Sequence, residues 1–336
     1  MRRQSLSAEI EHGGALDKAV ARFGGKPGDW LDLSTGINPE PFSLPELTPE
    51  IWNRLPDEGV LRETLRLARS YYGLRENASI VAAPGTQALI QLVPTLVAPS
   101  TVAVLGPTYQ EHAASFVACG WKVVSCAAIG EIPDEATAAV IVNPNNPDGR
   151  VVSKDDLQHL GRKLGARGGF LIVDEAFADT HEDVSVAADA EDMPMIVLKS
   201  FGKFFGLAGV RLGFAVAGKP FVEALQQRLG PWAVSGPALA IASHAFRDAE
   251  ALSNYRARID LRRLELSAVL EKSGLKEIGG TALFSLVEHP DAHELYARLC
   301  QRHILVRKFN YASRWLRIGL PLDDVALARL EKALKL

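Results

Sequence analysis

A lysine in a glycine-rich segment is the first candidate for chemistry in this sequence. Ser200, Lys203 and Arg211 lie in the string SFGKFFGLAGVRLG, directly after the apolar stretch 195–199. An amine forms an imine with an aldehyde, and a hydroxyl and a guanidinium can hold a phosphate group. The three side chains together could therefore bind a phosphorylated aldehyde. A lysine taken alone is more often an exposed surface residue, so this interpretation needs support from the rest of the chain.

Further polar strings also follow apolar stretches. Asp174 closes the run FLIVD, where a carboxylate could equally bind a metal ion or cap a helix. Asn146 lies in NPNNPDG after residues 138–142, and these residue types form turns in many proteins. Gly85 and Thr86, in PGTQ, open an expected helix whose backbone amides can cradle a phosphate. Each string comes at the end of an expected strand, and this shared position makes the set informative.

Two arginines add candidate anion ligands. Arg317 lies between apolar residues in SRWLRIG, and a buried arginine is costly without a carboxylate or phosphate partner. Arg307, in LVRK, is the second candidate, and a surface salt bridge is the alternative for both. Tyr109, in GPTY, also follows a strand, although a tyrosine at such a position is more often part of the core.

Strands and helices that alternate along the chain must position these residues. Apolar, β-branched runs predict strands, and amphipathic stretches between them predict helices. The expected strands are 79–82, 101–105, 122–126, 138–142, 170–174 and 195–199, and the expected helices include 87–96, 110–119 and 153–164. Such alternation is typical of an α/β fold with a mostly parallel sheet, in which ligands bind at the carboxyl ends of the strands.

The pattern changes near residue 220. A long helical region at 236–272 precedes short strands and helices that predict a smaller α+β domain. These strands are 282–287, 304–306 and 315–318, and the helices are 291–302 and 323–335. We therefore expect an N-terminal arm at 1–45 that packs with the small domain, a large domain at 46–219 and a small C-terminal domain at 220–336.

The string around Lys203 resembles the Schiff-base motif of fold-type I pyridoxal 5'-phosphate (PLP) enzymes, in the branch of the histidinol-phosphate aminotransferases. The resemblance extends over nearly the whole chain, from His12 to the last helix. It implies the PLP-dependent transferase fold, with PLP bound as an imine on Lys203 and Asp174 paired with the pyridinium nitrogen. The other implied cofactor ligands are Ser200, Arg211, Gly85 and Thr86 at the phosphate, Asn146 at the phenolate oxygen and Tyr109 stacked on the ring.

The same resemblance assigns substrate contacts and a partner. Arg317 would clamp the α-carboxylate of the substrate, and Arg307 the phosphate of a phosphorylated substrate. His12, Ser34 and Gly36, all on the arm, would help to bind the same molecule. Relatives are homodimers with active sites at the subunit interface, so the resemblance also implies a homodimer.

Two positions depart from the aminotransferase pattern. Phe177 stands where a tyrosine usually donates to the phenolate oxygen, and without that donor the imine pKa should rise. Leu55 stands where a tyrosine usually reaches the cofactor phosphate of the neighbouring subunit. The strings HGG, LDLSTGINP, NNPDGR and WLRIGLP resemble instead the decarboxylase branch of this family, which acts on L-threonine O-3-phosphate in cobalamin (vitamin B12) biosynthesis.

The expected function is therefore PLP-dependent decarboxylation of L-threonine O-3-phosphate to (R)-1-aminopropan-2-yl phosphate. The first alternative is an aminotransferase for histidinol phosphate or a related compound, because one cofactor site can serve both reactions. The second is a binding protein that keeps the fold without turnover. An intact set of Lys203, Asp174, Asn146 and Arg211 speaks against the second alternative.

Composition excludes other classes of partner. The chain has 336 residues and a formal net charge of −3, with no basic run for nucleic acid or an anionic membrane. Three scattered cysteines are too few for a disulfide framework or a zinc site, and they indicate buried thiols in a reducing compartment. No apolar segment follows the basic N-terminus and no long apolar stretch is free of proline, so we expect a cytoplasmic enzyme without a signal peptide, membrane span or metal site.

Overall fold

A seven-stranded sheet forms the centre of the larger of two lobes in the computed structural model, which describes residues 12–335. Its strand order is β2-β8-β7-β6-β5-β3-β4, and all neighbours are parallel except those of β8, which is antiparallel to β2 and β7. The strands are β2 (Ile80–Ala83), β3 (Thr101–Leu105), β4 (Lys122–Cys126), β5 (Ala138–Val142), β6 (Phe170–Asp174), β7 (Met195–Ser200) and β8 (Gly213–Ala217). The mostly parallel sheet expected from the sequence is confirmed, with β8 as an additional strand.

Helices cover both faces of this sheet, because every central strand is apolar on both sides. In β6, Phe170 and Ile172 pack into one core, whereas Leu171 and Val173 pack into the other. This alternation follows from the two-residue repeat of a strand. The helices α4 (Thr86–Leu92), α5 (Glu111–Ala118) and α8 (Lys219–Leu229) contribute to the first core, and α3 (Glu58–Tyr71), α6 (Lys154–Gly165) and α9 (Gly236–Arg247) to the second.

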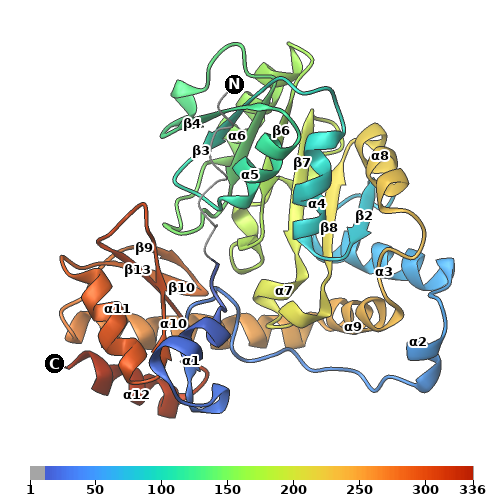
Figure 1. Cartoon of the computed structure of the whole chain (residues 1–336). Helices are drawn as coiled ribbons and strands as arrows, with labels where there is room; N and C mark the ends of the chain where they lie inside the picture. The colour runs from blue at the N-terminus through green and yellow to red at the C-terminus, as the bar shows by residue number, and fades with distance from the viewer. Residues whose placement is uncertain (1–11, 336) are drawn as a thin grey trace.

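The smaller lobe contains a four-stranded antiparallel sheet of order β12-β13-β10-β9. Its strands are β9 (Lys276–Thr281), β10 (Phe284–Glu288), β12 (Arg307–Lys308) and β13 (Trp315–Gly319), and its helices are α10 (Ala249–Lys272), α11 (Ala292–Gln301) and α12 (Asp324–Leu334). Figure 1 shows this lobe at the lower left, beside the larger lobe. The helical region expected at 236–272 is two helices, because Asp248 ends α9 and its side chain caps α10 by accepting from the backbone N–H of Ala251, 2.8 Å away.

The N-terminal segment packs against the smaller lobe. Helix α1 (Leu16–Phe23) lies near α11 (Figure 1), and β1 (Leu31–Asp32) pairs in parallel with β11 (Ile304–Leu305). The chain then runs along the bottom of the molecule to α2 (Pro49–Asn53) and enters the larger lobe (Figure 1). The short remaining elements are η1 (Pro27–Asp29), η2 (Val93–Thr95), η3 (Ile129–Glu131), η4 (Ala178–Thr180), η5 (Glu182–Val184), η6 (Ala187–Asp189), α7 (Phe201–Phe204) and η7 (Ala208–Val210).

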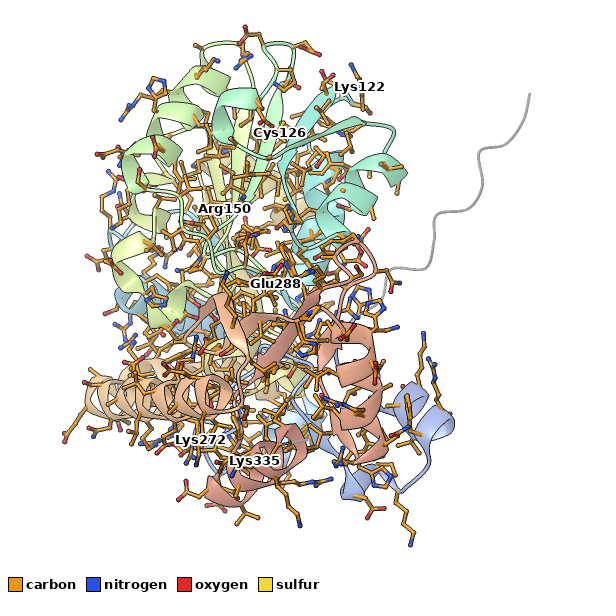
Figure 2. The ribbon with its side chains drawn as sticks, turned by 90° about the vertical axis from the view of Figure 1, so that its left-hand side faces the viewer. Lys122, Cys126, Arg150, Lys272, Glu288 and Lys335 are labelled. Atoms are coloured by element: carbon orange, nitrogen blue, oxygen red, sulfur yellow. The ribbon has the colours of Figure 1, made fainter. Side chains whose placement is uncertain are left out.

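A second view shows the two lobes at opposite ends of the molecule (Figure 2). Lys122 and Cys126 of β4 lie toward one end of the molecule and Lys272 and Lys335 toward the other, with Arg150 and Glu288 between them (Figure 2). None of the helices in residues 12–335 is both long and apolar enough to cross a membrane. All three cysteines are free thiols; Cys119 is half-buried and the other two are buried.

Candidate active site

The predicted site residues gather at the carboxyl ends of the parallel strands. Two adjoining cavities of about 140 and 160 Å³ lie there, and Tyr109, Asn146 and Lys203 line both of them. The deeper cavity also contains Asp174 and Ser200, together with Gly85, Thr86, Phe177 and Arg211. The outer cavity adds residues from the N-terminal segment and the smaller lobe: His12, Gly36, Arg307, Tyr311 and Arg317. We call this outer space the substrate cavity.

Lys203 lies in the single turn of α7, directly after β7. Burial of its amine lowers its pKa to about 8, and the positive charge of Arg317 adds to the decrease. An amine with this pKa is partly neutral near pH 7 and can attack a carbonyl carbon. The amine also lies 5.8 Å from the centre of the Phe177 ring.

Asp174 closes β6 and is 3% exposed. One oxygen, Oδ2, lies 2.8 Å from Nε2 of His112 on α5, and the other, Oδ1, accepts from the backbone N–H of Ala176 at 3.1 Å. These contacts fix the carboxylate in the deeper cavity. Sequence reasoning missed His112, because a single histidine on an apolar helix gives no signal of its own.

A buried ion pair joins the ends of β6 and β7 next to the site residues. Lys199 donates to Glu175 Oε2 at 2.7 Å, and both side chains are buried. Glu175 directly follows Asp174, and Lys199 directly precedes Ser200. Because the pair joins two neighbouring chain segments, it holds the adjacent site residues at a fixed spacing.

Four predicted phosphate ligands meet at the start of α4. Gly85 has φ of +86°, a conformation that favours glycine, and a Cβ there would lie 2.7 Å from Nη2 of Arg211. Arg211 itself has φ of +56° and bonds the carbonyl of Ala208 through Nη1 at 3.2 Å. With Thr86 in the first turn of α4 and Ser200 at the end of β7, these groups form a cradle of amides, a hydroxyl and a guanidinium that suits a phosphate.

Arg317 of β13 is buried between the lobes, with 6% of its surface exposed. Nη1 donates to Asn146 Oδ1 at 2.6 Å and Nη2 to the carbonyl of Ser34 at 2.8 Å, while Nε has no hydrogen-bond partner. Burial lowers the pKa of Arg317 to about 10, and the charge of Arg307 acts in the same direction. Both of these oxygens are neutral, so this buried cation is suited to an anionic ligand.

The arm residues predicted to bind substrate take different positions. His12 reaches the substrate cavity and lies 3.0 Å from Oε1 of Glu111 on α5. Gly36 also lines it, and a Cβ there would lie 2.9 Å from both Phe177 and Phe284. Ser34 does not line the substrate cavity.

The hydroxyl of Ser34 is used inside the arm. It accepts from the backbone N–H of Gly14 at 2.7 Å and donates to Asp32 at 2.6 Å. The contribution of Ser34 to the site is its carbonyl, which holds Arg317.

A chain of hydrogen bonds, which no sequence pattern indicated, links Tyr109 to the arm. The hydroxyl of Tyr109 donates to Gln87 Oε1 at 3.1 Å, and Gln87 Nε2 donates to Glu111 Oε2 at 3.0 Å. Glu111 in turn contacts His12. Burial raises the pKa of Tyr109 to about 12, helped by the charge of Glu111, so the phenol stays protonated and remains a donor.

The two residues that depart from the aminotransferase pattern lie in different environments. Phe177 is buried in the deeper cavity and packs edge-on against Phe284, with ring centres 5.2 Å apart. Leu55 is 63% exposed and lines neither cavity. Tyr311, which sequence reasoning did not single out, brings a hydroxyl-bearing side chain to the wall of the substrate cavity.

Comparisons with known proteins show what this chain is similar to. A family model described as aminotransferase class I and II matches residues 43–334. A threonine-phosphate decarboxylase from Sinorhizobium sp. is 48% identical over 98% of both chains, and one from Pseudomonas aeruginosa is 41% identical over 97% of both. A histidinol-phosphate aminotransferase from Ruminiclostridium cellulolyticum is 26% identical over 83% of this chain and 84% of its own.

Solved structures share the fold at lower identity. L-threonine-O-3-phosphate decarboxylase from Porphyromonas gingivalis aligns with a TM-score of 0.74 and 20% identity, over 90% of this chain and 98% of its own. Histidinol-phosphate aminotransferase from Sinorhizobium meliloti, solved in complex with PLP, aligns with a TM-score of 0.80 and 20% identity, over 97% and 95%. With a family model that matches most of its length and relatives above 40% identity along nearly all of it, this chain belongs to the aminotransferase class I and II family.

Proposed function

We propose that this protein is a PLP-dependent decarboxylase that converts L-threonine O-3-phosphate into (R)-1-aminopropan-2-yl phosphate, for cobalamin biosynthesis. The observation that carries the proposal is the presence of Arg317 and Arg307 in one cavity with Lys203. Two separate cations suit a substrate with both a carboxylate and a phosphate. Relatives named threonine-phosphate decarboxylase at 48% and 41% identity over nearly the whole chain support the same reaction, whereas histidinol-phosphate aminotransferases are 25–32% identical over 51–88% of it.

The deeper cavity has the donor set that PLP requires. Lys203 supplies an amine of lowered pKa, and the cradle around Gly85 and Arg211 suits the cofactor phosphate. Asp174, held by His112, is the carboxylate for the pyridine nitrogen, and Asn146 and Tyr109 line the same cavity. When bound, PLP withdraws electrons from the α-carbon of an amino acid and so allows a bond at that carbon to break.

The protein's own residues then determine which bond at the α-carbon breaks, because they orient the substrate. With PLP bound, the bond that breaks would be the one that overlaps the π electrons of the cofactor ring. Arg317 and Arg307 hold the two anionic groups of the substrate and so fix its rotation about the bond from the α-carbon to nitrogen. After carbon dioxide leaves, the amine of Lys203 is the group placed to return a proton to the α-carbon.

A product assay tests the proposal directly. Purified enzyme with PLP should release carbon dioxide from L-threonine O-3-phosphate without any keto-acid acceptor. Histidinol phosphate has no carboxylate for Arg317 and should be a poor substrate. Conversion of histidinol phosphate that depends on 2-oxoglutarate, with no carbon dioxide from threonine phosphate, would instead make the protein an aminotransferase.

We further propose a cytoplasmic homodimer built from an arm at 1–45, a large domain at 46–219 and a small domain at 220–336, of which α8 and α9 pack against the sheet of the large domain. Exposed apolar side chains support the dimer: Trp52 is 67% exposed, Leu55 63% and Trp232 59%. A Cβ on Gly236 of α9 would lie 2.7 Å from the carbonyl of Ile51, so α2 and the start of α9 are in contact in this apolar region.

A further inference from the structure

Cationic side chains gather in a third cavity, outside the site described above. It has a volume of about 270 Å³ and lies between α1 on one side and β11 and β12 on the other. The lining side chains that can carry positive charge are His12, Lys18, Arg22, Arg307 and Lys308. No lining residue is acidic among those described. We call this space the arm cavity.

Local structure explains why the charges face one another. Lys18 and Arg22 are four residues apart on α1 and therefore lie on the same side of the helix. Ala19 is buried and Ala15 half-buried, so the body of α1 packs closely against the lobe. Opposite them, Lys308 extends from β12 with its ammonium 5.4 Å from the centre of the Tyr296 ring. Two parts of the chain that are far apart in sequence thus bring like charges to one space.

The charges increase in burial toward the active site. Lys18 and Arg22 are exposed, whereas Arg307 and Lys308 are half-buried. Because Arg307 and Lys308 are half-buried, their charges are less screened by solvent than charges on an open surface.

The arm cavity adjoins the substrate cavity, because two residues form part of the wall of both. His12 and Arg307 line both spaces. An anion bound to Arg307 in the arm cavity would therefore contact a residue that also lines the substrate cavity, as Lys203 does. Clusters of like charge in a partly enclosed cleft concentrate ions of the opposite sign and raise the rate of their capture.

We propose that the arm cavity is a binding site for phosphate monoesters that feeds the substrate cavity. The phosphate of the incoming molecule binds first near Arg22 and Lys308 and then passes to Arg307. The identity of the ligand rests on the proposed function, in which the substrate is a phosphorylated amino acid. The anion site itself rests only on the charges and shape of the cavity.

The test removes the outer charges and leaves the active site intact. In the holoenzyme, the double variant Arg22→Ala/Lys308→Ala should lower kcat/KM for O-phospho-L-threonine about tenfold, with kcat within about twofold of the original value. Its kcat/KM should also depend less on salt concentration. The control Lys122→Ala/Lys219→Ala removes two exposed lysines from the other lobe and should change none of these values.

A second measurement does not depend on turnover. Calorimetric titration of the holoenzyme with inorganic phosphate should show a binding site that the Arg22→Ala/Lys308→Ala variant lacks and the control variant retains. If the enzyme proves not to decarboxylate threonine phosphate, this titration still decides whether the anion site exists. Equal phosphate binding by all three proteins would overturn the proposal, and loss of binding without any fall in kcat/KM would overturn the feeding role.

Discussion

Arg317 donates a 2.6 Å hydrogen bond to the side-chain oxygen of Asn146, and so joins β13 of the smaller lobe to the loop after β5 of the larger one. The residue proposed to hold the substrate carboxylate and a residue proposed to contact the cofactor thus form one unit. Closure of the two lobes and construction of the site are therefore coupled, because the bond between these two side chains is lost if the lobes separate.

Substitution of each arginine should show which anionic group of the substrate it binds. Arg307→Ala should lower kcat/KM for threonine phosphate far more than for unphosphorylated threonine, because only the former carries a phosphate. Arg317→Ala should lower kcat/KM for both compounds alike, because both carry the α-carboxylate. Each loss should be on the order of 2–4 kcal/mol, measured as kcat/KM for both compounds. Equal effects of Arg307→Ala on the two substrates would remove this residue from the phosphate site.

Lys203→Ala should abolish the visible absorbance of the bound cofactor. No other lysine among the described residues lines the deeper cavity, so no other amine can form the imine there. Absorbance spectra after dialysis and fixation by borohydride report on this directly. A variant that still retains the band and is still labelled by borohydride would show that another amine binds PLP.

Asp174→Asn should retain cofactor and lose most turnover. The amide keeps the size of the side chain but removes the negative charge that stabilises a protonated pyridine nitrogen. Cofactor content from absorbance and kcat from carbon dioxide release separate the two effects. Near-normal kcat would exclude Asp174 from the proposed role.

Cofactor loading should depend on pH through Lys203, whose amine has a pKa of about 8. Only the neutral amine attacks an aldehyde, so the rate of PLP uptake by cofactor-free protein should rise about tenfold per pH unit below 8 and level off above it. The rate can be followed by rapid-mixing absorbance. In Arg317→Gln the midpoint should move upward, because a positive charge that lowers the pKa of Lys203 is removed. An unchanged midpoint would contradict that contribution.

The exposed tryptophans should mark the dimer interface. Trp52→Glu should shift the protein toward monomer in sedimentation velocity, because a charge in an apolar contact is poorly solvated. Val325→Glu changes an even more exposed apolar residue on α12 and should leave the sedimentation coefficient unchanged. An active monomer in the unaltered protein at working concentration would exclude the dimer.

Apolar periodicity predicted most of the larger lobe, because its strands are buried on both faces. It missed β8 and β9, which contain Gly213 and the pair Gly279–Gly280 in place of a full β-branched run. Glycine lowers strand propensity, and here it serves close approach: a Cβ on Gly213 would lie 2.6 Å from the backbone nitrogen of Thr86. Strand signals are weakest where the backbone itself approaches the site.

The candidate site was predictable where a residue type and its position at a strand end coincide, as for Lys203 and Asp174. His112 and Glu111 were not predictable, because their importance comes from a helix that packs across the strand ends. Ser34 illustrates the opposite case, since its hydroxyl satisfies neighbours on the arm and only its carbonyl reaches Arg317. Sequence patterns identify which groups are present, and tertiary packing decides which of their atoms face the ligand.

The parallel pairing of β1 with β11 places Leu31 beside Ile304, almost the full length of the chain away. During synthesis, the segment that leaves the ribosome early must therefore wait for one that leaves near the end. Gly85, Thr86, Ser200, Lys203 and Arg211 all precede Ile304 in the chain, whereas Arg307 and Arg317 follow it. The residues proposed to hold the cofactor are therefore synthesised before those proposed to clamp the substrate.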